Sequence, residues 1–239
     1  MKPGVFLTAE WRDLAMLNYE VEPSLLHRHV PAGTELDEWN GKNFVSLVGF
    51  LFLNTRVRGI SIPLHSDFEE VNLRFYVRRK APDGWRRGVV FIREIVPKLA
   101  VATIANIVYN ESYSTLPMRH QIALQAGSGG DVQYSWRWRG HWNQLQIKTQ
   151  GAPQKIAEGS QAEFITEHYW GYAAQRDGGC MEYGVEHPRW RVWQSQAASL
   201  ECDVAEIYGA EYCHYLNQMP NSAFVAQGSR VVVRRGVRL

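Results

Sequence analysis

Hydrogen-bonding side chains recur at every second position of one segment, residues 68–78. They are Glu70, Asn72, Arg74 and Tyr76, and they alternate with Val71, Leu73, Phe75 and Val77. Successive residues of an extended chain face opposite sides, so this pattern predicts a strand with one polar and one apolar face. An arginine on such a face can bind a carboxylate through two parallel N–H donors. Glu70 could neutralise the charge of this arginine, or it could act as an acid or base.

The surroundings of each face decide whether this chemistry is available. If the apolar face packs beneath a helix, the polar face lines the lumen of a barrel. Arg74 is then a fixed positive charge, and Asn72 and Tyr76 orient a ligand. If the polar face looks onto solvent, the same pattern belongs to an ordinary half-exposed strand. The sequence leaves both arrangements open.

A second group of candidate side chains lies in residues 109–120, YNESYSTLPMRH. Glu111 stands between two tyrosines, and partial burial there would raise its pKa and make it a candidate for proton transfer. The second of these tyrosines, Tyr113, is a candidate ligand contact, as are Met118 and His120. The competing interpretation is a loop with a carboxylate at the end of a helix.

The histidines and cysteines offer weaker support for chemistry. His168 and His187 are candidate bases or ligands, but two histidines without further spaced ligands do not define a metal site, and no metal is expected. Cys180, Cys202 and Cys213 form no CxxC pair. Their odd number is a poor disulfide framework and favours a reduced, cytosolic setting.

The elements that must position these side chains are mostly strands. Residues 44–53 are apolar on both sides of the alternation, which predicts a fully buried strand. Residues 68–78 and 88–95 form a hairpin across the Asp-Gly turn of 81–85. Further strands are predicted at 131–139, 142–149, 180–187, 190–196 and 223–235. Helices are predicted at 97–109, from 161 and near 203–216. Loops are predicted at 126–131, 150–160 and 177–179. This count favours a β-rich single domain over 1–239, an antiparallel barrel with a few flanking helices.

Aromatic and basic residues interleave in residues 135–139, SWRWR, as in strands that bind nucleic acids. Alternation puts the aromatic residues on one face and Arg137 and Arg139 on the other, which favours a barrel wall with a solvated outer face. The formal net charge is +2, so no nucleic-acid partner is expected. A nucleic-acid or protein adaptor using this strand and the basic C-terminal run is the weakest hypothesis.

Composition and missing motifs narrow the function further. The 239 residues are 45% hydrophobic and 21% charged, as in a globular chain with a sizeable core. The nine tryptophans suit a lined pocket, β structure or a homodimer interface. No signal peptide or membrane-length apolar run is visible, so a cytoplasmic protein without a membrane partner is expected. The Rossmann, Walker, nucleophile-elbow and HExxH motifs are absent, and no cofactor is expected.

Six segments, in order along nearly the whole chain, resemble the YqjF-like family, domain of unknown function 2071. They are NYEVEPSLLHRHVPAGTELDEWNGKNFVSLVGFLF (18–52), FEEVNLRFYV (68–77), YNESYSTLPM (109–118), FITEHYWGY (164–172), VEHPRW (185–190) and FVAQGS (224–229). The family is uncharacterised, so the resemblance implies no activity. It implies a fold similar to the acetoacetate decarboxylase-like superfamily, a β-barrel around an apolar cavity.

The resemblance also bears on the chemistry. In the decarboxylases, a Gly-Arg-Glu stretch leads to a Pro-Lys-Lys whose lysine forms a Schiff base with a β-keto acid. The segment that looks equivalent here, residues 110–119, carries Met118 where that lysine would stand, and a thioether forms no imine. Lys98 of REIVPKL precedes the predicted helix instead of following it, and we expect it to be exposed and unactivated.

Two hypotheses of different classes follow. The first is a module that binds or senses a small, anionic organic molecule in the barrel, with Arg74 holding its negative group and without the Schiff-base lysine. The second is an enzyme of the lyase, isomerase or hydrolase type, in which Glu111 or Glu70 transfers a proton while Arg74 holds a carboxylate.

Overall fold

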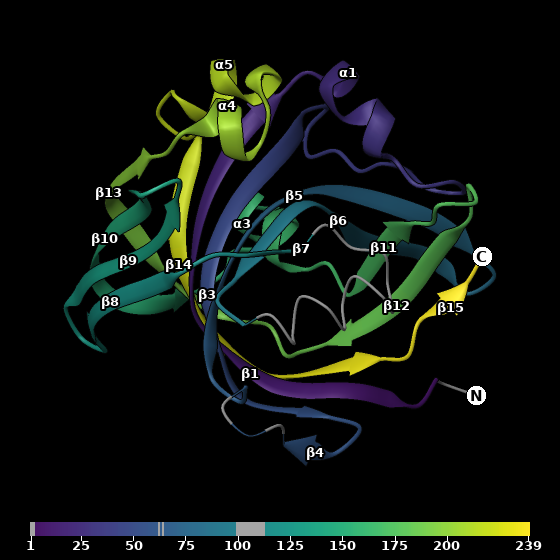
Figure 1. The fold of residues 1–239 in the computed structure, drawn as a ribbon, viewed down its shortest axis with the longest axis horizontal. Helices are drawn as coiled ribbons and strands as arrows, with labels where there is room; N and C mark the ends of the chain where they lie inside the picture. The colour runs from purple at the N-terminus through teal and green to yellow at the C-terminus, as the bar shows by residue number, and fades with distance from the viewer. Residues whose placement is uncertain (1–2, 62, 64, 99–112) are drawn as a thin grey trace.

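A computed structural model describes residues 3–61, 63, 65–98 and 113–239, and Figure 1 shows its arrangement. The strands belong to one fifteen-stranded sheet. They are β1 (Val5–Val21), β2 (Glu35–Leu36), β3 (Asn43–Val57), β4 (Ile60–Ser61), β5 (Phe68–Ala81), β6 (Gly84–Val96), β7 (Tyr113–Thr115), β8 (Met118–Gln125), β9 (Gly129–Trp138), β10 (His141–Lys155), β11 (Trp170–Ala174), β12 (Cys180–Glu186), β13 (Arg191–Glu201), β14 (Ser222–Arg234) and β15 (Val237–Arg238). The helices are short: α1 (Pro23–Leu26), η1 (His27–His29), α3 (Gln161–Thr166), α4 (Val204–Ile207), η2 (Ala210–Tyr212) and α5 (Cys213–Leu216).

Seven strands of the sheet form a ring. They follow one another in the order β14, β1, β3, β5, β6, β11 and β12. The pairs Val185↔Val233 and Glu186↔Val232 then join β12 back to β14. Most pairings are antiparallel, as predicted, whereas β6 pairs with β7 and β11 in parallel. Strands β13, β10, β9 and β8 continue from β14 as a side extension of the sheet.

Hydrophobic side chains fill two cores, one on each side of β5. The outer core holds the apolar face of that strand together with side chains of β9, β10, α4 and α5. Figure 1 places α1, α4 and α5 together at one end of the ring. The inner core includes Phe50, Phe52, Tyr76, Phe164 and Trp190. The polar face of β5 therefore looks into the ring and not onto solvent.

The structure confirms the strand, the hairpin and the helix that the clearest sequence patterns predicted. The buried strand predicted at 44–53 lies within β3, and the hairpin predicted across the Asp-Gly turn joins β5 to β6. The helix predicted from 161 is α3, and Ser160 caps it as predicted, although the Glu163 side chain bonds to the residue before the cap. Ser160 Oγ accepts a hydrogen bond from Glu163 N at 3.2 Å, and the Glu163 carboxylate accepts one from Gly159 N at 2.7 Å.

Other elements differ from the prediction. Residues 5–21 form β1 and residues 118–125 form β8, and the sequence analysis predicted neither strand. The predicted loop at 150–160 begins too early, because β10 continues to Lys155. Beyond residue 98, the helix predicted at 97–109 lies outside the described residues.

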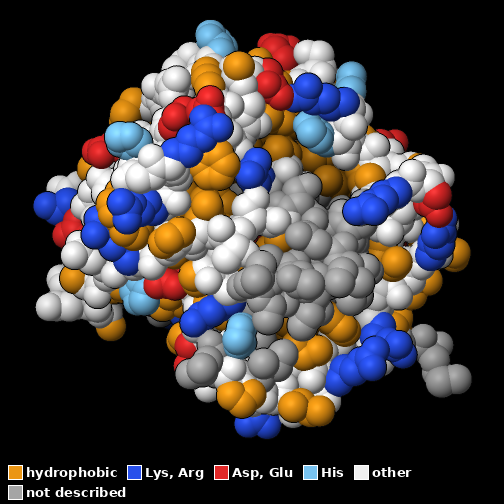
Figure 2. Space-filling view, in the orientation of Figure 1, with side chains coloured by type: hydrophobic (Ala, Val, Ile, Leu, Met, Phe, Trp, Pro, Cys, Tyr) orange, Lys and Arg blue, Asp and Glu red, His pale blue; other side chains and the backbone are white. Residues whose placement is uncertain are grey.

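The aromatic stripe of residues 135–139 lies on β9 and packs into the outer core, where Trp136 is fully buried. It is therefore not a wall of the ring's interior. Figure 2 shows Lys and Arg side chains spread among acidic and hydrophobic ones over one face of the molecule. The three cysteines are free thiols. In the described part of the chain, no helix has the length and apolar character needed to cross a bilayer.

Contact between the two parts of the sheet depends on a glycine. A Cβ on Gly49 of β3 would lie 2.7 Å from the ring of Tyr134, which is fully buried and donates its hydroxyl to Asp13 O at 3.0 Å. We expect Gly49→Ala to lower the free energy of unfolding by about 1–3 kcal/mol, because the ring has no room to move. Urea unfolding measures this loss. Gly127→Ala is the matched control, since a Cβ there meets nothing within 4 Å, and equal stability of the two variants would contradict the prediction.

Candidate functional site

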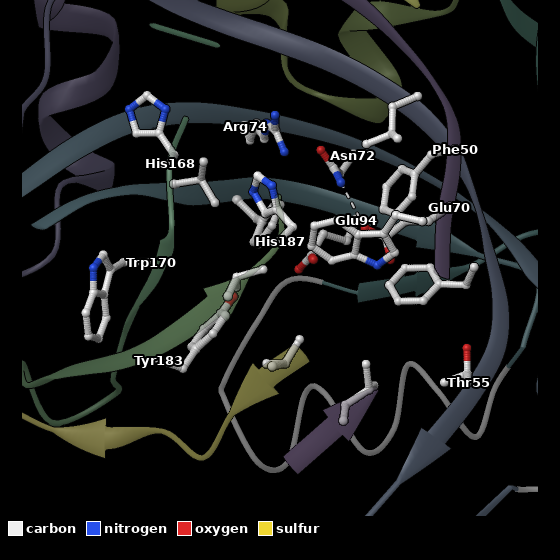
Figure 3. Close-up of a pocket in the computed structure, with 18 of the residues that line it drawn as sticks. Phe50, Thr55, Glu70, Asn72, Arg74, Glu94, His168, Trp170, Tyr183 and His187 are labelled. Atoms are coloured by element: carbon white, nitrogen blue, oxygen red, sulfur yellow. Dashed lines mark hydrogen bonds between the residues drawn. The ribbon is translucent and has the colours of Figure 1, made fainter. Parts of the chain in front are cut away.

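A cavity of about 150 Å³ lies inside the ring, and Figure 3 shows its lining. All seven strands of the ring contribute side chains to it. A cavity of this size holds a molecule about as large as benzene. Much of its wall is aromatic, with contributions from Trp11, Phe50, Phe52, Phe68, Phe91, Trp170, Tyr183 and Trp190. The cavity therefore suits a small, partly apolar ligand.

Arg74 brings a positive charge into this apolar space. It lies on the inward face of β5 and lines the cavity. Its Nε is buried without a hydrogen-bond partner, and its guanidinium carbon lies 5.9 Å from the centre of the Tyr76 ring. Among the described residues, none forms an ion pair or hydrogen bond with this guanidinium. A partly desolvated cation without a counter-ion is costly, and a bound anion would remove that cost.

Glu70 and Asn72 precede Arg74 on the same face and are almost fully buried. Asn72 Nδ2 donates a hydrogen bond to Glu70 Oε1 at 2.8 Å, and the hydroxyl of Tyr113 on β7 donates to Oε2 at 3.3 Å. These two donors are neutral groups, and Glu70 does not form the ion pair with Arg74 that the sequence suggested. Asn72 Oδ1 is buried without a partner and is a further acceptor at the site.

Glu94 is a cavity residue that the sequence analysis missed. It lies on β6 directly opposite Asn72, and it pairs on its other side with Tyr113. It is 1% exposed and lines the cavity. Its position depends on a register shift in β6 opposite Leu73 and Arg74, which turns Glu94 inward. Two buried carboxyl groups, those of Glu70 and Glu94, therefore line the cavity, and carboxyl groups can transfer protons.

One lining residue, His168, belongs to a buried histidine–aspartate pair. His168 lines the cavity, and its Nε2 lies 3.3 Å from Asp37 Oδ2, which also accepts a hydrogen bond from Arg87 Nε at 2.6 Å. Burial lowers the pKa of His168 to about 4, against the opposing effect of its bond to Asp37. Burial raises the pKa of Asp37, but the bonds from His168 and Arg87 outweigh this and lower it. Asp37 is therefore ionised and His168 neutral near pH 7.

Some residues predicted for the site lie elsewhere. Tyr76 shares the inward face of β5 but lies outside the cavity lining. Its hydroxyl lies 2.5 Å from Ser46 Oγ, and the centre of its ring lies 4.6 Å from that of the His168 ring. Met118 and His120 lie on β8, away from the cavity. Met118 packs against the outer core, and His120 Nδ1 bonds Glu69 Oε1 at 2.7 Å.

Further predictions concern Glu111, lysine chemistry and metals. Glu111 lies outside the described residues. Lys98 is half-buried, and the described lining of the cavity contains no lysine. Within the described ranges, no three His, Cys, Asp or Glu residues gather where they could hold a metal ion. Among the tryptophans, Trp85 and Trp142 are exposed, and a homodimer using such residues stays a prediction.

Comparison with known proteins finds a family model that matches most of the chain. The model of DUF2071, described as an uncharacterized conserved protein, matches residues 8–230. The uncharacterized protein YqjF of Bacillus subtilis is 37% identical over 83 residues. That match covers 34% of this chain and 34% of YqjF, so it spans about a third of the relative's length.

Solved structures share the whole fold at low sequence identity. The acetoacetate decarboxylase of Legionella pneumophila has a TM-score of 0.69 and 13% identity, over 100% of this chain and 88% of its own. The enduracididine biosynthesis enzyme MppR, in complex with pyruvate, has a TM-score of 0.68 and 11% identity, over 100% of this chain and 91% of its own. An acetoacetate decarboxylase-like enzyme from Sphingomonas wittichii has a TM-score of 0.66 and 12% identity, over 98% of this chain and 92% of its own. The chain therefore has the acetoacetate decarboxylase-like fold.

The buried His168 makes stability depend on pH. The unfolded histidine takes up a proton near its ordinary pKa of 6.5, whereas the folded one does so only near 4. Between these values the unfolded state binds more protons, so the folded state loses stability as pH falls from 6.5 to 4, by as much as about 3 kcal/mol. Burial also lowers the pKa of His29 and His187, which adds to the same trend.

We therefore expect His168→Gln to show a shallower fall in unfolding free energy over pH 6.5 to 4 than the wild type. Urea unfolding at a series of pH values compares the two slopes, so a lower absolute stability of the variant does not affect the result. His214→Gln is the control, because that ring is exposed. Parallel curves for the wild type and His168→Gln would contradict the assignment.

Proposed function

The chain belongs to the DUF2071 family, and on the fold of that family we propose that it binds a small organic anion in the cavity inside the ring, with Arg74 as the anchor. The observation that carries the proposal is the guanidinium of Arg74, which lines the cavity without an ion pair to any described residue. A guanidinium presents parallel N–H donors that match the two oxygens of a carboxylate. The preferred ligand class is therefore a carboxylic acid.

The remainder of the cavity limits the ligand's size and polarity. The aromatic walls favour a short hydrocarbon body, and a volume of about 150 Å³ leaves room for only a few non-hydrogen atoms besides the carboxylate. MppR, which shares the fold, has been solved with pyruvate, itself a short carboxylate. That likeness adds support for the ligand class.

Removing the charge tests the anchor. We expect Arg74→Met to weaken the binding of short carboxylates by about 10- to 100-fold, because a charge-assisted hydrogen bond contributes about 1.5–3 kcal/mol. Isothermal titration calorimetry against a panel of organic acids measures the loss. Arg78→Met is the matched control: it lies on the same strand, outside the cavity lining, and pairs with Glu35 at 2.7 Å. Equal loss in both variants, or no binding by the wild type, would reject the anchor.

A second candidate function is catalysis of proton transfer on the bound acid. It is favoured by the burial of Glu70 in the same cavity as Arg74, where Asn72 and Tyr113 fix the carboxylate oxygens. A positioned carboxylate can remove a proton from the carbon next to the ligand's carboxyl group and later return one. Glu111, the other carboxylate that the sequence suggested for this role, stays a prediction.

Isotope exchange separates catalysis from binding. If Glu70 transfers the proton, the wild type in D₂O replaces the C–H hydrogen next to the carboxylate with deuterium, and Glu70→Gln slows this at least about 100-fold. Proton NMR of the acid follows the exchange. Because the amide keeps the shape of the carboxylate, the variant should still bind the acid with nearly unchanged affinity. Absence of exchange with the wild type would leave binding as the function and exclude this role for Glu70.

A further inference from the structure

His187 presents a lone pair whose position is fixed by the backbone. The residue follows β12, and its Nδ1 lies 3.0 Å from the carbonyl oxygen of Pro188. A carbonyl oxygen only accepts hydrogen bonds, so Nδ1 must carry the proton of the neutral ring. The other nitrogen, Nε2, then carries the lone pair. It bonds to no described residue, which leaves an acceptor available.

The ring is half-buried, and this partial burial keeps it neutral. Burial lowers the pKa of His187, an effect to which the nearby charge of Arg74 adds. The bond to Pro188 and the charge of Glu167 oppose the shift without reversing it. Near pH 7 the imidazole is therefore an acceptor at Nε2.

Two aromatic rings hold the imidazole in place. It stacks on Trp190 with ring centres 4.2 Å apart and planes 19° apart, and the Tyr169 ring centre lies 4.8 Å away. His187 lines the same cavity as Arg74, and Figure 3 shows both side chains in the same part of it. A rotation of the ring would cost both the stacking and the bond to Pro188. The acceptor therefore has a set direction, as a recognition group requires.

The histidine–aspartate pair of the cavity differs from His187. His168 Nε2 is committed to Asp37, and its Nδ1, like Asn72 Oδ1, is buried without a hydrogen-bond partner. His65 also lines the cavity with its Nδ1 2.9 Å from the Pro63 carbonyl, but no ring contact with another described residue holds its imidazole, whereas Trp190 and Tyr169 hold that of His187.

We propose that His187 Nε2 accepts a hydrogen bond from a hydroxyl group of the ligand, so that the cavity selects a short hydroxy acid over the same acid without its hydroxyl. This rests on the proposed function, in which Arg74 holds the carboxylate. The cation and the acceptor together require a molecule with an anionic group at one end and a hydrogen-bond donor within the few atoms that the cavity admits. An acid with no hydroxyl would leave the imidazole lone pair unpaired and desolvated, which weakens its binding.

Matched pairs of acids test the selection. We expect lactate to bind more tightly than propionate, or 3-hydroxybutyrate more tightly than butyrate, by about 3- to 10-fold in isothermal titration calorimetry, the effect of one neutral hydrogen bond. His187→Phe keeps a ring on Trp190 but removes the acceptor, and should reduce that ratio to about 1, because the hydroxy acid loses a hydrogen bond and the acid without a hydroxyl no longer leaves a lone pair unpaired. His65→Phe is the matched control and should keep the wild-type ratio.

The outcomes separate this inference from the proposed function. Binding of both members of every pair with equal affinity would overturn the selection by His187 and leave Arg74 as the anchor. Binding of neither member of any pair would overturn both. A ratio that survives His187→Phe, or falls equally in His65→Phe, would also overturn the inference.

A spectroscopic measurement keeps the inference testable if His187→Phe fails to fold. In ¹⁵N-histidine-labelled wild-type protein, long-range ¹H–¹⁵N correlation should show His187 protonated at Nδ1. Adding the hydroxy acid should shift the Nε2 resonance, and adding its partner without the hydroxyl should not. A proton on Nε2, or equal shifts with both acids, would overturn the proposal.

Discussion

The alternation along β5 places an arginine inside the ring and keeps it there. Val71, Leu73, Phe75 and Val77 on the opposite face are completely buried in the outer core. Burying each such side chain contributes about 1.5–3 kcal/mol. A slip of one residue would move all of them into the cavity and Arg74 into the outer core. The packing of the outer core therefore offsets the cost of holding an unpaired guanidinium in an apolar space.

Much of the fold and the centre of the site could be predicted because both follow from short, regular patterns. The two-residue period of β5 and the Asp-Gly turn after it predicted the hairpin and the shared face of Glu70, Asn72 and Arg74, and the capping residue Ser160 predicted the helix that follows it. Glu94 could not be found in this way. Counting back from the turn pairs Asn72 with Arg93 and turns Glu94 outward, but one extra residue in β6 reverses this. Such an irregularity has no signal in residue types.

The misplaced residues show a different limit. Tyr76 has the predicted orientation, but its position along the strand brings it against Ser46 and His168, so neighbours fill the space that a ligand would need. Met118 and His120 were grouped with Tyr113 because they are close in sequence. The chain passes from β7, beside β6, to β8, at the edge of the side extension, within a few residues. Sequence distance therefore carried no information about which side of the ring these residues reach.

The charges of the cavity explain why Arg74 remains available. Glu70 lies only two residues away and would neutralise the guanidinium if its oxygens were free to turn. Asn72 and Tyr113 instead donate a hydrogen bond to one oxygen each, and Glu70 forms no ion pair with Arg74. Burial keeps His168 and His187 neutral, and in the described lining Arg74 is the only arginine or lysine. The described lining thus combines one arginine, two carboxyl groups and two neutral imidazoles. Under the proposed function, a single cation matches a monoanion better than a dianion, and the acceptors around it match a ligand that also carries a hydrogen-bond donor.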